Sequence, residues 1–430
     1  MGRLRSTTIF FLHLLRDLLG TLRGRFARGW RRLIRREKSG VVGVDVFPFF
    51  ERMTGVGWYE WNLLSAMDRR DDGLRYNLYA HSFLAPSDPA APPMPGFRRM
   101  NLRIHHLPAE FLFPIRPTLW FLRRVMEPLL RFLDGNDVLF APNFFMPRSQ
   151  LPYGPTIVAT VHDLAFKALP DTVNQATLDE LERNLAATLA RSSRLIAVSE
   201  ATACDITEYL NIDREQVRII HEGLDPDFPG EDEPVPPAGL PSSYVLFVST
   251  LEPRKNVVGI LEAFSLAVDR GYSGHLVLVG RWGWRTESIR KALESSRVRD
   301  RIMHLDYVER RQLAGLYSGA DAFLFPSWLE GFGLPLLEAM ACGTPVITSN
   351  RSAMPEVAGP AGICVDPADP SAIASALMEL LENPDRRRAL SEAGRQRAAQ
   401  FSWDEAAAAT AQVLRQAAGL EQIAPDEYRV

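Results

Sequence analysis

Short apolar runs recur along most of the chain and alternate with segments of helical periodicity. Runs bounded by turn residues are typical of buried parallel strands, whereas apolar residues every three or four positions indicate helices that pack on them. The predicted strands are Val41–Phe47, Val138–Ala141, Thr156–Val161, Leu195–Val198, Tyr244–Ser249, His275–Val279, Ile302–Leu305 and Ala322–Phe325. The predicted helices are Trp58–Met67, Gln175–Ala190, Glu200–Tyr209, Val257–Asp269, Glu287–Ser296, Arg310–Gly319 and Trp403–Ala418.

The alternation of strand and helix is interrupted once, by a segment rich in proline and acids at residues 229–243, and then restarts. Such a segment reads as an interdomain linker. A chain of 430 residues also exceeds the usual size of one domain. The pattern predicts two doubly wound α/β domains. The expected divisions are an N-terminal segment 1–40, a first domain 41–228, the linker 229–243, a second domain 244–402, and a final helix and tail 403–430.

Charge is distributed unevenly. The net charge is −3, which argues against a general nucleic-acid binder, but residues 1–40 carry ten Arg and one Lys against two acids, a net charge of +9. An apolar stripe at helical spacing runs through the same residues, from Phe11 to Leu33. We interpret the segment as an amphipathic helix on an anionic membrane surface. A disordered basic tail, a misassigned start codon and an organellar targeting peptide are the alternatives.

Two further features bear on location. Aromatic residues and arginines occur together in Ala109–Leu133. This combination suits lipid head groups or a lipid-diphosphate acceptor, or a core helix whose arginines extend to water. The three cysteines, Cys204, Cys342 and Cys364, are far apart and lack metal-ligand spacing. They are expected to be free thiols, mostly in the core, in a reducing compartment. The expected location is the cytoplasm, peripherally at the inner face of the cell membrane.

The strongest candidate chemistry lies in Ser327–Val346. Glu330 and Glu338 lie eight residues apart, with a glycine-bearing loop between them. Pro335 suits a first helical position, and Gly343 suits the residue just past a short helix. The segment therefore predicts a strand, a loop and a helix N-terminus, which together direct backbone N–H groups toward a phosphate. Two acids beside such a cradle suit sugar hydroxyls, so the pair indicates a nucleotide-sugar site.

This segment, with its sequence GFGLPLLEAMACGTPV, resembles the donor site of the retaining glycosyltransferases of family 4. Other segments match the family in the same order and extend over roughly residues 41 to 405. They are Thr160–Leu164 (TVHDL), Ala197–Ala201 (AVSEA), Gly223–Asp225 (GLD), Leu251–Asn256 (LEPRKN) and Val277–Gly280 (VLVG). The resemblance implies the α/β GT-B fold, with two Rossmann-like domains that face a cleft and a last helix, Trp403–Ala418, that returns to the first domain.

The resemblance also implies roles for residues of the second domain. Glu330 is expected to face the sugar hydroxyls near the reacting carbon, and Glu338 to hold the ribose hydroxyls. Lys255 is expected to bind the diphosphate, with Arg254 beside it as a further donor ligand or an ion-pair partner. Many family members have an arginine shortly before the lysine. Here those positions are Ser249 and Thr250, and either hydroxyl is a candidate to replace that contact. The loop at the phosphate comprises Gly331, Phe332, Gly333 and Leu334.

In the first domain, His162 follows an apolar strand. A lone histidine is usually structural, but the resemblance implies that this one bonds a sugar hydroxyl and lies near the departing phosphate. Gly55 and Gly57 are predicted in a loop after the first strand, where their backbone could approach donor phosphate or acceptor. Asp225 and Asp227 form an Asp-x-Asp in a turn, which we interpret as a loop-forming element rather than a metal site. No metal or other cofactor is expected.

These observations predict a retaining glycosyltransferase that moves a hexose from a nucleotide diphosphate sugar to a lipid-linked or growing saccharide acceptor. Mannose from GDP-mannose is the leading donor, because LEPRKN and HDL resemble bacterial mannosyltransferases of surface polysaccharide assembly. A UDP-sugar such as UDP-glucose is the alternative donor. Two other classes compete: a catalytically silent sugar-nucleotide-binding scaffold, and an epimerase or phosphorylase of the same fold.

Overall fold

The structure is a computed structural model of the chain. It describes residues 40–46, 49, 53–80, 96–104, 134–144, 156–173, 175–228 and 235–421. Five predictions fall partly or wholly outside these residues. They concern the basic segment at the N-terminus, the end of the strand Val41–Phe47, the stretch Ala109–Leu133, the first part of the proline-rich linker (residues 229–234) and the tail after residue 421.

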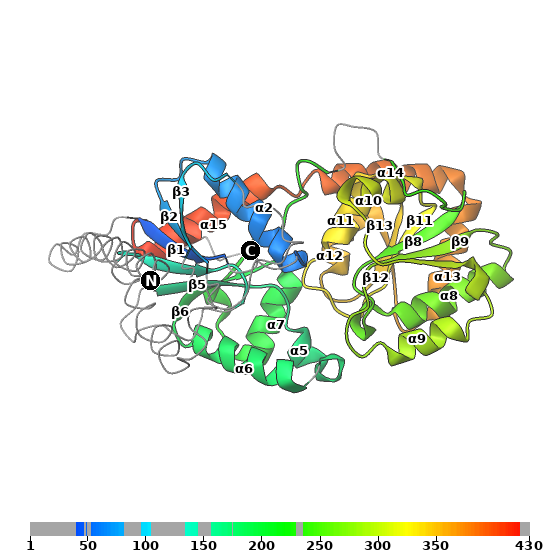
Figure 1. The fold of residues 1–430 in the computed structure, drawn as a ribbon, viewed down its shortest axis with the longest axis horizontal. Helices are drawn as coiled ribbons and strands as arrows, with labels where there is room; N and C mark the ends of the chain where they lie inside the picture. Colours follow the sequence, from blue (N-terminus) through cyan, green and yellow to red (C-terminus); the bar gives the residue numbers. More distant parts are fainter. Residues whose placement is uncertain are drawn as a thin grey trace, which may run out of the picture. The chain divides into compact units, whose positions relative to one another are not determined.

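The described residues form two sheets, and the first has seven strands in the order β3-β2-β1-β4-β5-β6-β7 (Figure 1). The strands are β1 (Val41–Asp45), β2 (Arg75–Ala80), β3 (Met100–Ile104), β4 (Val138–Ala141), β5 (Thr156–Val161), β6 (Ser192–Ala197) and β7 (Val217–Ile219). Strands β1 to β5 pair in parallel. The order runs outward from β1 in both directions, so this sheet is doubly wound.

The second sheet has six strands in the order β10-β9-β8-β11-β12-β13, and all five of its pairings are parallel. The strands are β8 (Tyr244–Val248), β9 (His275–Val279), β10 (Ile302–Leu305), β11 (Ala322–Phe325), β12 (Val346–Ser349) and β13 (Gly362–Val365). The strand order reverses between β8 and β11. Ligands of doubly wound sheets bind at such a point, beyond the carboxyl ends of the strands.

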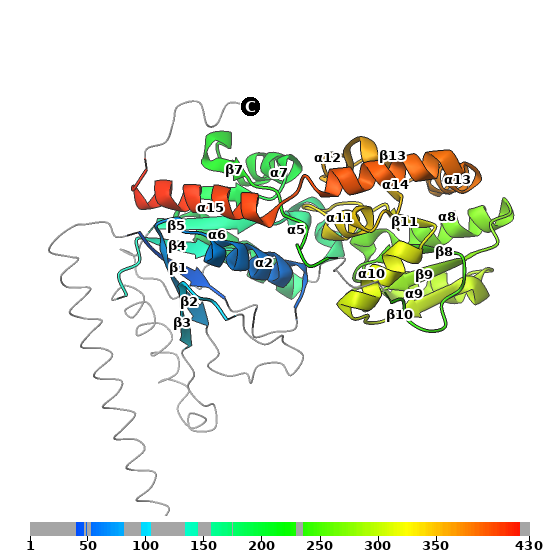
Figure 2. The same cartoon turned by 90° about the horizontal axis from the view of Figure 1, so that it is seen from above.

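Helices cover the sheets, and each sheet buries the apolar runs that predicted it (Figures 1 and 2). The helices are α2 (Gly55–Arg69), α5 (Ala165–Ala168), α6 (Gln175–Leu189), α7 (Glu200–Leu210), α8 (Val257–Asp269), α9 (Glu287–Glu294), α10 (Arg310–Gly319), α11 (Leu334–Ala341), α12 (Met354–Ala358), α13 (Pro370–Glu382), α14 (Pro384–Ala398) and α15 (Trp403–Ala418). Around the second sheet, α8 packs against α9 and α13, whereas α11 packs against α10 and α14.

The contacts of the chain divide it into two compact units. Among the described residues, the first unit comprises those up to Thr160, Asn184–Leu195, and α15 from Ala408 onward. The second comprises Val161–Arg183 and Ile196–Ala407. The end of β5, α5 and α7 therefore belong to the same unit as the six-stranded sheet. The domain boundaries predicted from the sequence remain predictions.

The predicted α/β class, with two parallel doubly wound sheets, is confirmed. Two local predictions are wrong. Gly55 and Gly57 lie in the first turn of α2 and not in a loop, because the helix begins directly after Thr54, whose carbonyl accepts the Trp58 N–H at 2.9 Å. The cysteines are free but not mostly in the core: Cys204 and Cys364 are exposed. Cys364 lies on β13, which is an edge strand with fewer neighbours to cover it.

No helix in the part of the chain that the structure describes is long and apolar enough to cross a membrane.

Candidate functional site

Glu330 lies in the loop that follows β11, one of the two strands at the switch point of the second sheet. The loop is held by the turn before α12: the Glu330 N–H donates to Ser352 Oγ at 3.1 Å, and the Ser352 hydroxyl donates to the Glu330 carbonyl. The residue is 6% exposed. Both the backbone and the side chain of Glu330 are therefore fixed.

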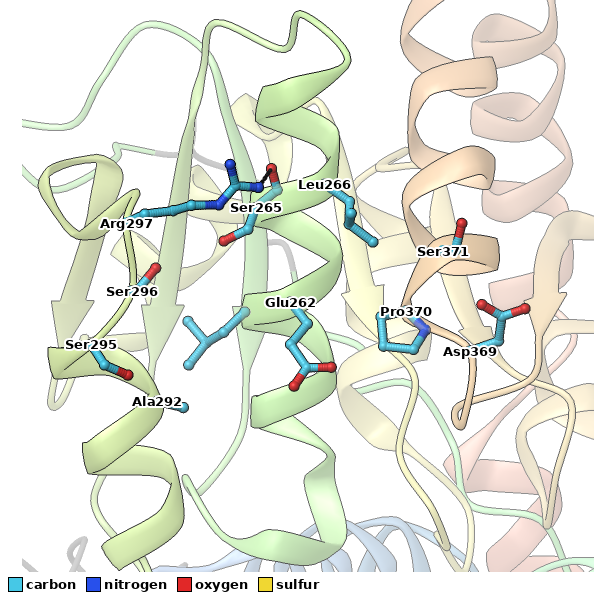
Figure 3. Close-up of a pocket in the computed structure, with 11 residues that line it drawn as sticks. Glu262, Ser265, Leu266, Ala292, Ser295, Ser296, Arg297, Asp369, Pro370 and Ser371 are labelled. Carbon is cyan, nitrogen blue, oxygen red and sulfur yellow. Dashed lines mark hydrogen bonds between the residues drawn. The ribbon is translucent and has the colours of Figure 1, made fainter.

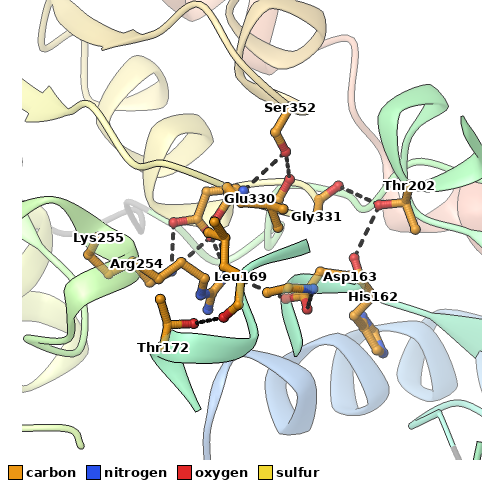
Figure 4. Close-up of polar contacts among 12 residues, drawn as sticks. His162, Asp163, Leu169, Thr172, Thr202, Arg254, Lys255, Glu330, Gly331 and Ser352 are labelled. Carbon is orange, nitrogen blue, oxygen red and sulfur yellow. Dashed lines mark hydrogen bonds and ion pairs between the residues drawn. The ribbon is translucent and has the colours of Figure 1, made fainter. Parts of the chain in front are cut away.

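Lys255 reaches Glu330 from the turn that follows β8, the other strand at the switch point. Its Nζ atom lies 2.6 Å from Glu330 Oε1 and 2.8 Å from Oε2 (Figure 4). Arg254 lies next to this pair, with Nη1 3.4 Å from Glu330 Oε2 and 3.4 Å from Asp163 Oδ2, and Nη2 3.1 Å from Glu252 Oε1. Two cations and three carboxylates thus form one cluster in the second unit. We call these five residues the charge cluster.

Burial makes the charges of this cluster depend on one another. Burial and the neighbouring Arg254 lower the pKa of Lys255, while Glu330 and Glu252 act in the opposite direction. Burial also disfavours the charged form of Arg254, but the surrounding carboxylates outweigh it and raise its pKa. Arg254 therefore carries a fixed positive charge. The ammonium of Lys255 depends on Glu330 for its compensation, because a buried charge without a partner is strongly unfavourable.

The turn that presents Lys255 is fixed by the residue after it. Pro253–Lys255 form one 3₁₀ turn, and Asn256 follows in the left-handed conformation, with φ of 55°. Its Nδ2 group donates to the carbonyls of Pro326 at 3.1 Å and Pro367 at 2.7 Å. Asn256 thereby ties the Lys255 turn to the loop that carries Glu330. The sequence analysis did not single out Asn256, although asparagine tolerates this backbone conformation better than most residues.

Gly331 packs directly on the end of β5. A Cβ atom at this position would lie 1.6 Å from the carbonyl oxygen of His162. The Gly331 carbonyl accepts hydrogen bonds from Ser199 Oγ at 2.6 Å and from Thr202 Oγ1 at 3.3 Å. Thr202 Oγ1 also lies 3.3 Å from the His162 carbonyl (Figure 4). The start of α7 thus joins the loop after β5 to the loop after β11.

Ser199 caps the start of α7, because its side chain accepts the Thr202 N–H at 3.1 Å. Its contact with Gly331, and the whole role of Thr202, were not foreseen. These partners are far apart in the chain, and nothing local in AVSEA indicates them.

His162 and Glu222 form a buried pair. The His162 Nδ1 atom lies 3.6 Å from Glu222 Oε1, and the two residues are 7% and 6% exposed. The sequence analysis selected His162 and missed Glu222. The carboxylate follows β7, so only the fold shows that the two residues meet.

Glu338 projects from α11 and belongs to a second polar group. Tyr317 donates its hydroxyl to Glu338 Oε2 at 3.0 Å. Burial raises the pKa of Glu338, against the lowering effects of Arg310 and of the Tyr317 hydrogen bond. Arg310 is also ion-paired with Asp225 at 2.5 Å, and the Asp227 N–H donates to Asp225 Oδ1 at 2.8 Å. The carboxylate of Asp225 is thus engaged by a cation and by its own turn.

The remaining candidates of the loop after β11 differ in exposure. Phe332 is 2% exposed and packs between the rings of His221 and Phe401, with centroids 5.9 and 5.6 Å away. Its backbone, and not its ring, is therefore the part that could contact a donor. Gly333 has φ of 109° and precedes α11, which begins at Leu334. This left-handed conformation suits glycine, and it leads into the helix N-terminus predicted from the sequence.

Three candidates lie apart from these contacts. Thr250 is exposed, next to the backbone of Gly283. Gly55 and Gly57 belong to the first unit, and their predicted role stays a prediction.

A surface groove of about 640 Å³ opens between α8, the end of α9 and the start of α13 (Figure 3). None of the candidate residues lines this groove.

Comparisons with known proteins agree with this arrangement. The model of glycosyltransferase family 4 matches residues 53–228, and that of the glycosyl transferases group 1 matches residues 231–397. The O-antigen chain mannosyltransferase B of Escherichia coli is 31% identical over 279 residues, which are 63% of this chain and 72% of that protein.

Two solved structures share the fold. Sucrose-phosphate synthase from Thermosynechococcus elongatus has a TM-score of 0.67 at 22% identity, over 89% of this chain and all of that one. HepE of Anabaena, solved with UDP-glucose, has a TM-score of 0.62 at 16% identity, over 87% of this chain and 99% of that one. The fold is therefore GT-B. The fold, the two matching family models and the mannosyltransferase relative agree. The chain therefore belongs to the family 4 and group 1 glycosyltransferases.

Proposed function

We propose that this enzyme transfers a hexose from a nucleotide diphosphate sugar to a lipid-linked or growing saccharide acceptor, and that it retains the configuration of the anomeric carbon. The charge cluster is the observation that carries the proposal. It lies at the switch point of a doubly wound sheet, where such folds bind ligands, and it precedes the N-terminus of α11. Lys255, Arg254 and this helix end are the groups suited to a departing diphosphate.

The charge developed in glycosyl transfer suits these residues. The leaving diphosphate gains negative charge, which fixed cations and N–H groups stabilise in a site with little water. The sugar becomes positively charged at the reacting carbon, and hydroxyl contacts hold it in place. When Lys255 contacts a phosphate, it releases the Glu330 carboxylate. That carboxylate can then accept hydrogen bonds from the sugar hydroxyls. His162 is the proposed partner of a sugar hydroxyl beside the leaving phosphate.

We propose mannose from GDP-mannose as the donor. The support is the mannosyltransferase relative of Escherichia coli and the LEPRKN and HDL segments. HepE, solved with UDP-glucose, keeps a UDP-sugar as the second candidate. We also propose that transfer needs no metal. Asp225 begins the Asp-x-Asp, and its carboxylate already pairs with Arg310 and accepts the backbone N–H of Asp227. The charge cluster supplies two cations that can take the place of a metal at the diphosphate.

A membrane-bound acceptor is the proposed reason for the basic N-terminus. The support is the net charge of +9 over residues 1–40, with its apolar stripe. Residues 1–39 lie outside the described part of the chain, so this proposal rests on the sequence alone. It places the enzyme at the inner face of the cell membrane.

A donor screen tests the function. The full chain would be heated with GDP-mannose, UDP-glucose and other nucleotide sugars, because a specific ligand raises the melting temperature by mass action. The donors that bind would then be incubated with membrane lipid extract, and release of the nucleoside diphosphate would be measured. We expect GDP-mannose to stabilise the protein and to be consumed. Binding without consumption would favour the silent scaffold instead.

The variant Glu330→Gln links turnover to the charge cluster. It keeps the shape of the side chain but removes the charge. We expect it to fold, to bind donor and to lose transfer. Glu262→Gln is the matched control, because Glu262 is exposed on α8 in the same unit. Full activity of Glu330→Gln would remove Glu330 from the site.

A further inference from the structure

Glu356, on the short helix α12, binds two separate segments of the second unit. Its two carboxylate oxygens lie 3.0 Å from the backbone nitrogen of Glu200, and Oε2 lies 3.5 Å from that of Ala201, at the start of α7. Its Oε1 atom also lies 2.6 Å from His221 Nε2, in the segment after β7. An ionised carboxylate only accepts hydrogen bonds, so the proton between the two side chains belongs to Nε2. The sequence analysis singled out neither Glu356 nor His221.

The carboxylate of Glu356 is ionised in the folded protein. Burial raises its pKa, but the hydrogen bonds from His221 and from the Glu200 backbone outweigh burial, and the pKa lies below its ordinary value. The first N–H groups of a helix have no partner within the helix and carry the positive end of its dipole, which favours an anion there. Ser199 accepts a further N–H of the same turn, that of Thr202. Two side chains thus cap α7 together.

The contacts of Glu356 lead back to the loop after β11 by two routes. By the first, Ser352 in the turn before α12 exchanges two hydrogen bonds with the backbone of Glu330 (Figure 4). By the second, Ser199 at the start of α7 donates to the Gly331 carbonyl at 2.6 Å. Glu356 joins the two routes, and it is the one polar side chain of α12. We call Ser199, Ser352 and Glu356 the loop clamp.

His221 connects the loop clamp to the next residue of the loop. Its ring packs against Phe332, with centroids 5.9 Å apart, and against Phe401, with centroids 5.6 Å apart. Phe332 is 2% exposed, so its ring is enclosed at this place. Three successive residues of the loop are therefore held by Ser352, Ser199 and His221, in that order.

The cations of the charge cluster have an attachment of their own. Lys255 and Arg254 belong to the turn after β8, which Asn256 ties to two backbone carbonyls. Neither of these two bonds involves the loop clamp. The position of Glu330, in contrast, depends on the clamp. Loosening the clamp should therefore displace the carboxylate proposed for the sugar more than the cations proposed for the diphosphate.

We propose that Glu356 is a positioning residue of the glycosyl-transfer site. Through the loop clamp it fixes the backbone of Glu330 and Gly331, so that the Glu330 carboxylate meets the sugar hydroxyls of the donor. This inference rests on the proposed function, because it assumes that Glu330 contacts the sugar. A displacement of about 1 Å at a reacting centre can cost about a hundredfold in rate, so a residue that touches no substrate can still control transfer.

Kinetics and binding of Glu356→Gln test this role. The variant keeps the size of the side chain but removes its charge and one of its two acceptor oxygens. We expect kcat for transfer to fall by about tenfold or more, while the affinity for the nucleoside diphosphate changes by less than about threefold. The probes are GDP-mannose and GDP, or UDP-glucose and UDP if these react. A wild-type kcat would overturn the inference, and so would an equal loss of nucleoside diphosphate affinity, which indicates a general loss of structure.

Asp369→Ala is the matched control, because it removes the cap of another helix in the same unit. The Asp369 side chain accepts the Ala372 N–H at 3.0 Å at the start of α13, and in the described part of the chain it makes no hydrogen bond to the loop after β11. Loss of such a cap costs about 0.5–2 kcal/mol, so the control is also destabilised. Its kcat should stay at the wild-type value. A control that loses as much transfer as Glu356→Gln would overturn the inference, because stability and not position would then be responsible.

The variant His221→Phe breaks the same contact from the other side, and it serves if Glu356→Gln does not fold. Phenylalanine keeps a ring next to Phe332 but cannot donate to Glu356. The His221 side chain is 41% exposed, so the fold should tolerate the change. We expect kcat to fall by about threefold or more, and the change should have little effect in a Glu356→Gln background. A wild-type kcat, or equal effects in both backgrounds, would contradict the inference.

Hydrogen exchange of the free protein gives a readout that needs no activity. Glu356→Gln should speed exchange of the amides of residues 330–333 and of the first turn of α7 by about tenfold or more, whereas Asp369→Ala should not. Unchanged exchange in the loop would overturn the inference even if transfer is confirmed. Faster exchange, together with no transfer by the wild type from any nucleotide sugar, would instead refute the proposed function alone.

Discussion

Replacing Gly331 by alanine tests how tightly the loop after β11 is joined to the end of β5. The added Cβ atom would lie 1.6 Å from the His162 carbonyl oxygen and 2.7 Å from its carbon. Real Cβ contacts are essentially never shorter than 3.0 Å, so the two backbones must separate by more than an ångström. Both contacts are to backbone, which cannot rotate away as the end of a side chain can.

This separation also breaks hydrogen bonds. The Gly331 carbonyl accepts hydrogen bonds from the hydroxyls of Ser199 and Thr202. Both bonds would be lost if the loop moved away from α7. Overpacking of this kind costs about 1–3 kcal/mol, and each buried hydrogen bond adds about 0.5–1.5 kcal/mol. The expected loss of unfolding free energy is therefore about 2–6 kcal/mol. For a unit of this size it corresponds to a melting temperature about 4–24 °C lower.

Thermal and urea unfolding of the purified chain would measure this loss. Gly96→Ala is the control, because a Cβ atom at Gly96 meets nothing within 4 Å. The control should melt with the wild type, whereas Gly331→Ala should melt well below it. The variant should also lose donor binding, because Glu330 is the preceding residue of the same loop. A melting temperature of Gly331→Ala within about 1 °C of the control would refute the packing argument.

Two further predictions concern buried charges. Glu60 on α2 is fully buried beside Asp45, and within the described part of the chain neither of its carboxyl oxygens has a hydrogen-bond partner. Burial, reinforced by Asp45, raises the pKa of Glu60, so the folded state holds the proton and stability falls as the pH rises above the ordinary range of a glutamate. Glu60→Met should therefore raise the unfolding free energy by about 1–3 kcal/mol at neutral pH, and by less at acid pH. Urea unfolding at both pH values would measure this gain, and no gain at either pH would contradict the prediction. Lys255→Met should weaken nucleoside diphosphate binding by about tenfold or more while leaving nucleoside binding unchanged, and equal losses in calorimetry would contradict its phosphate role.

Periodicity predicted much of the fold, because the central strands are short apolar runs with abrupt ends. Val138–Ala141, Thr156–Val161 and Ala322–Phe325 were predicted with the bounds that the structure shows. Two of the strands without a prediction are of another kind. Arg75–Ala80 alternates polar and apolar residues, and Gly362–Val365 is an edge strand whose exposed side needs no apolar residues. A pattern based on apolar runs does not detect either.

The candidate site was predictable where its evidence is local. Glu330, Gly333 and the start of α11 form one continuous segment, so strand, loop and helix could be predicted together. Their partners come from distant parts of the chain. Lys255 precedes Glu330 by 75 residues, and nothing in either segment states that the ammonium and the carboxylate touch. The pairing of His162 with Glu222 is equally invisible before the sheet order is known.

The contact between Lys255 and Glu330 bears on the order of events at the site. The charge cluster holds three carboxylates and two cations, so with all five residues ionised it carries one net negative charge. A diphosphate would meet this charge unless it takes Lys255 from Glu330, and the exchange leaves the Glu330 carboxylate without its nearest cation. A buried carboxylate in that state is costly, and sugar hydroxyls that donate to it reduce the cost. The diphosphate would pair with Lys255, and the sugar hydroxyls would pair with Glu330. Each part of the donor would thus bind a group whose partner is taken by the other part, and the two parts would bind cooperatively. On this reasoning the complete nucleotide sugar binds more tightly than its nucleoside diphosphate, and the loss of the sugar on transfer weakens the hold on the remaining product.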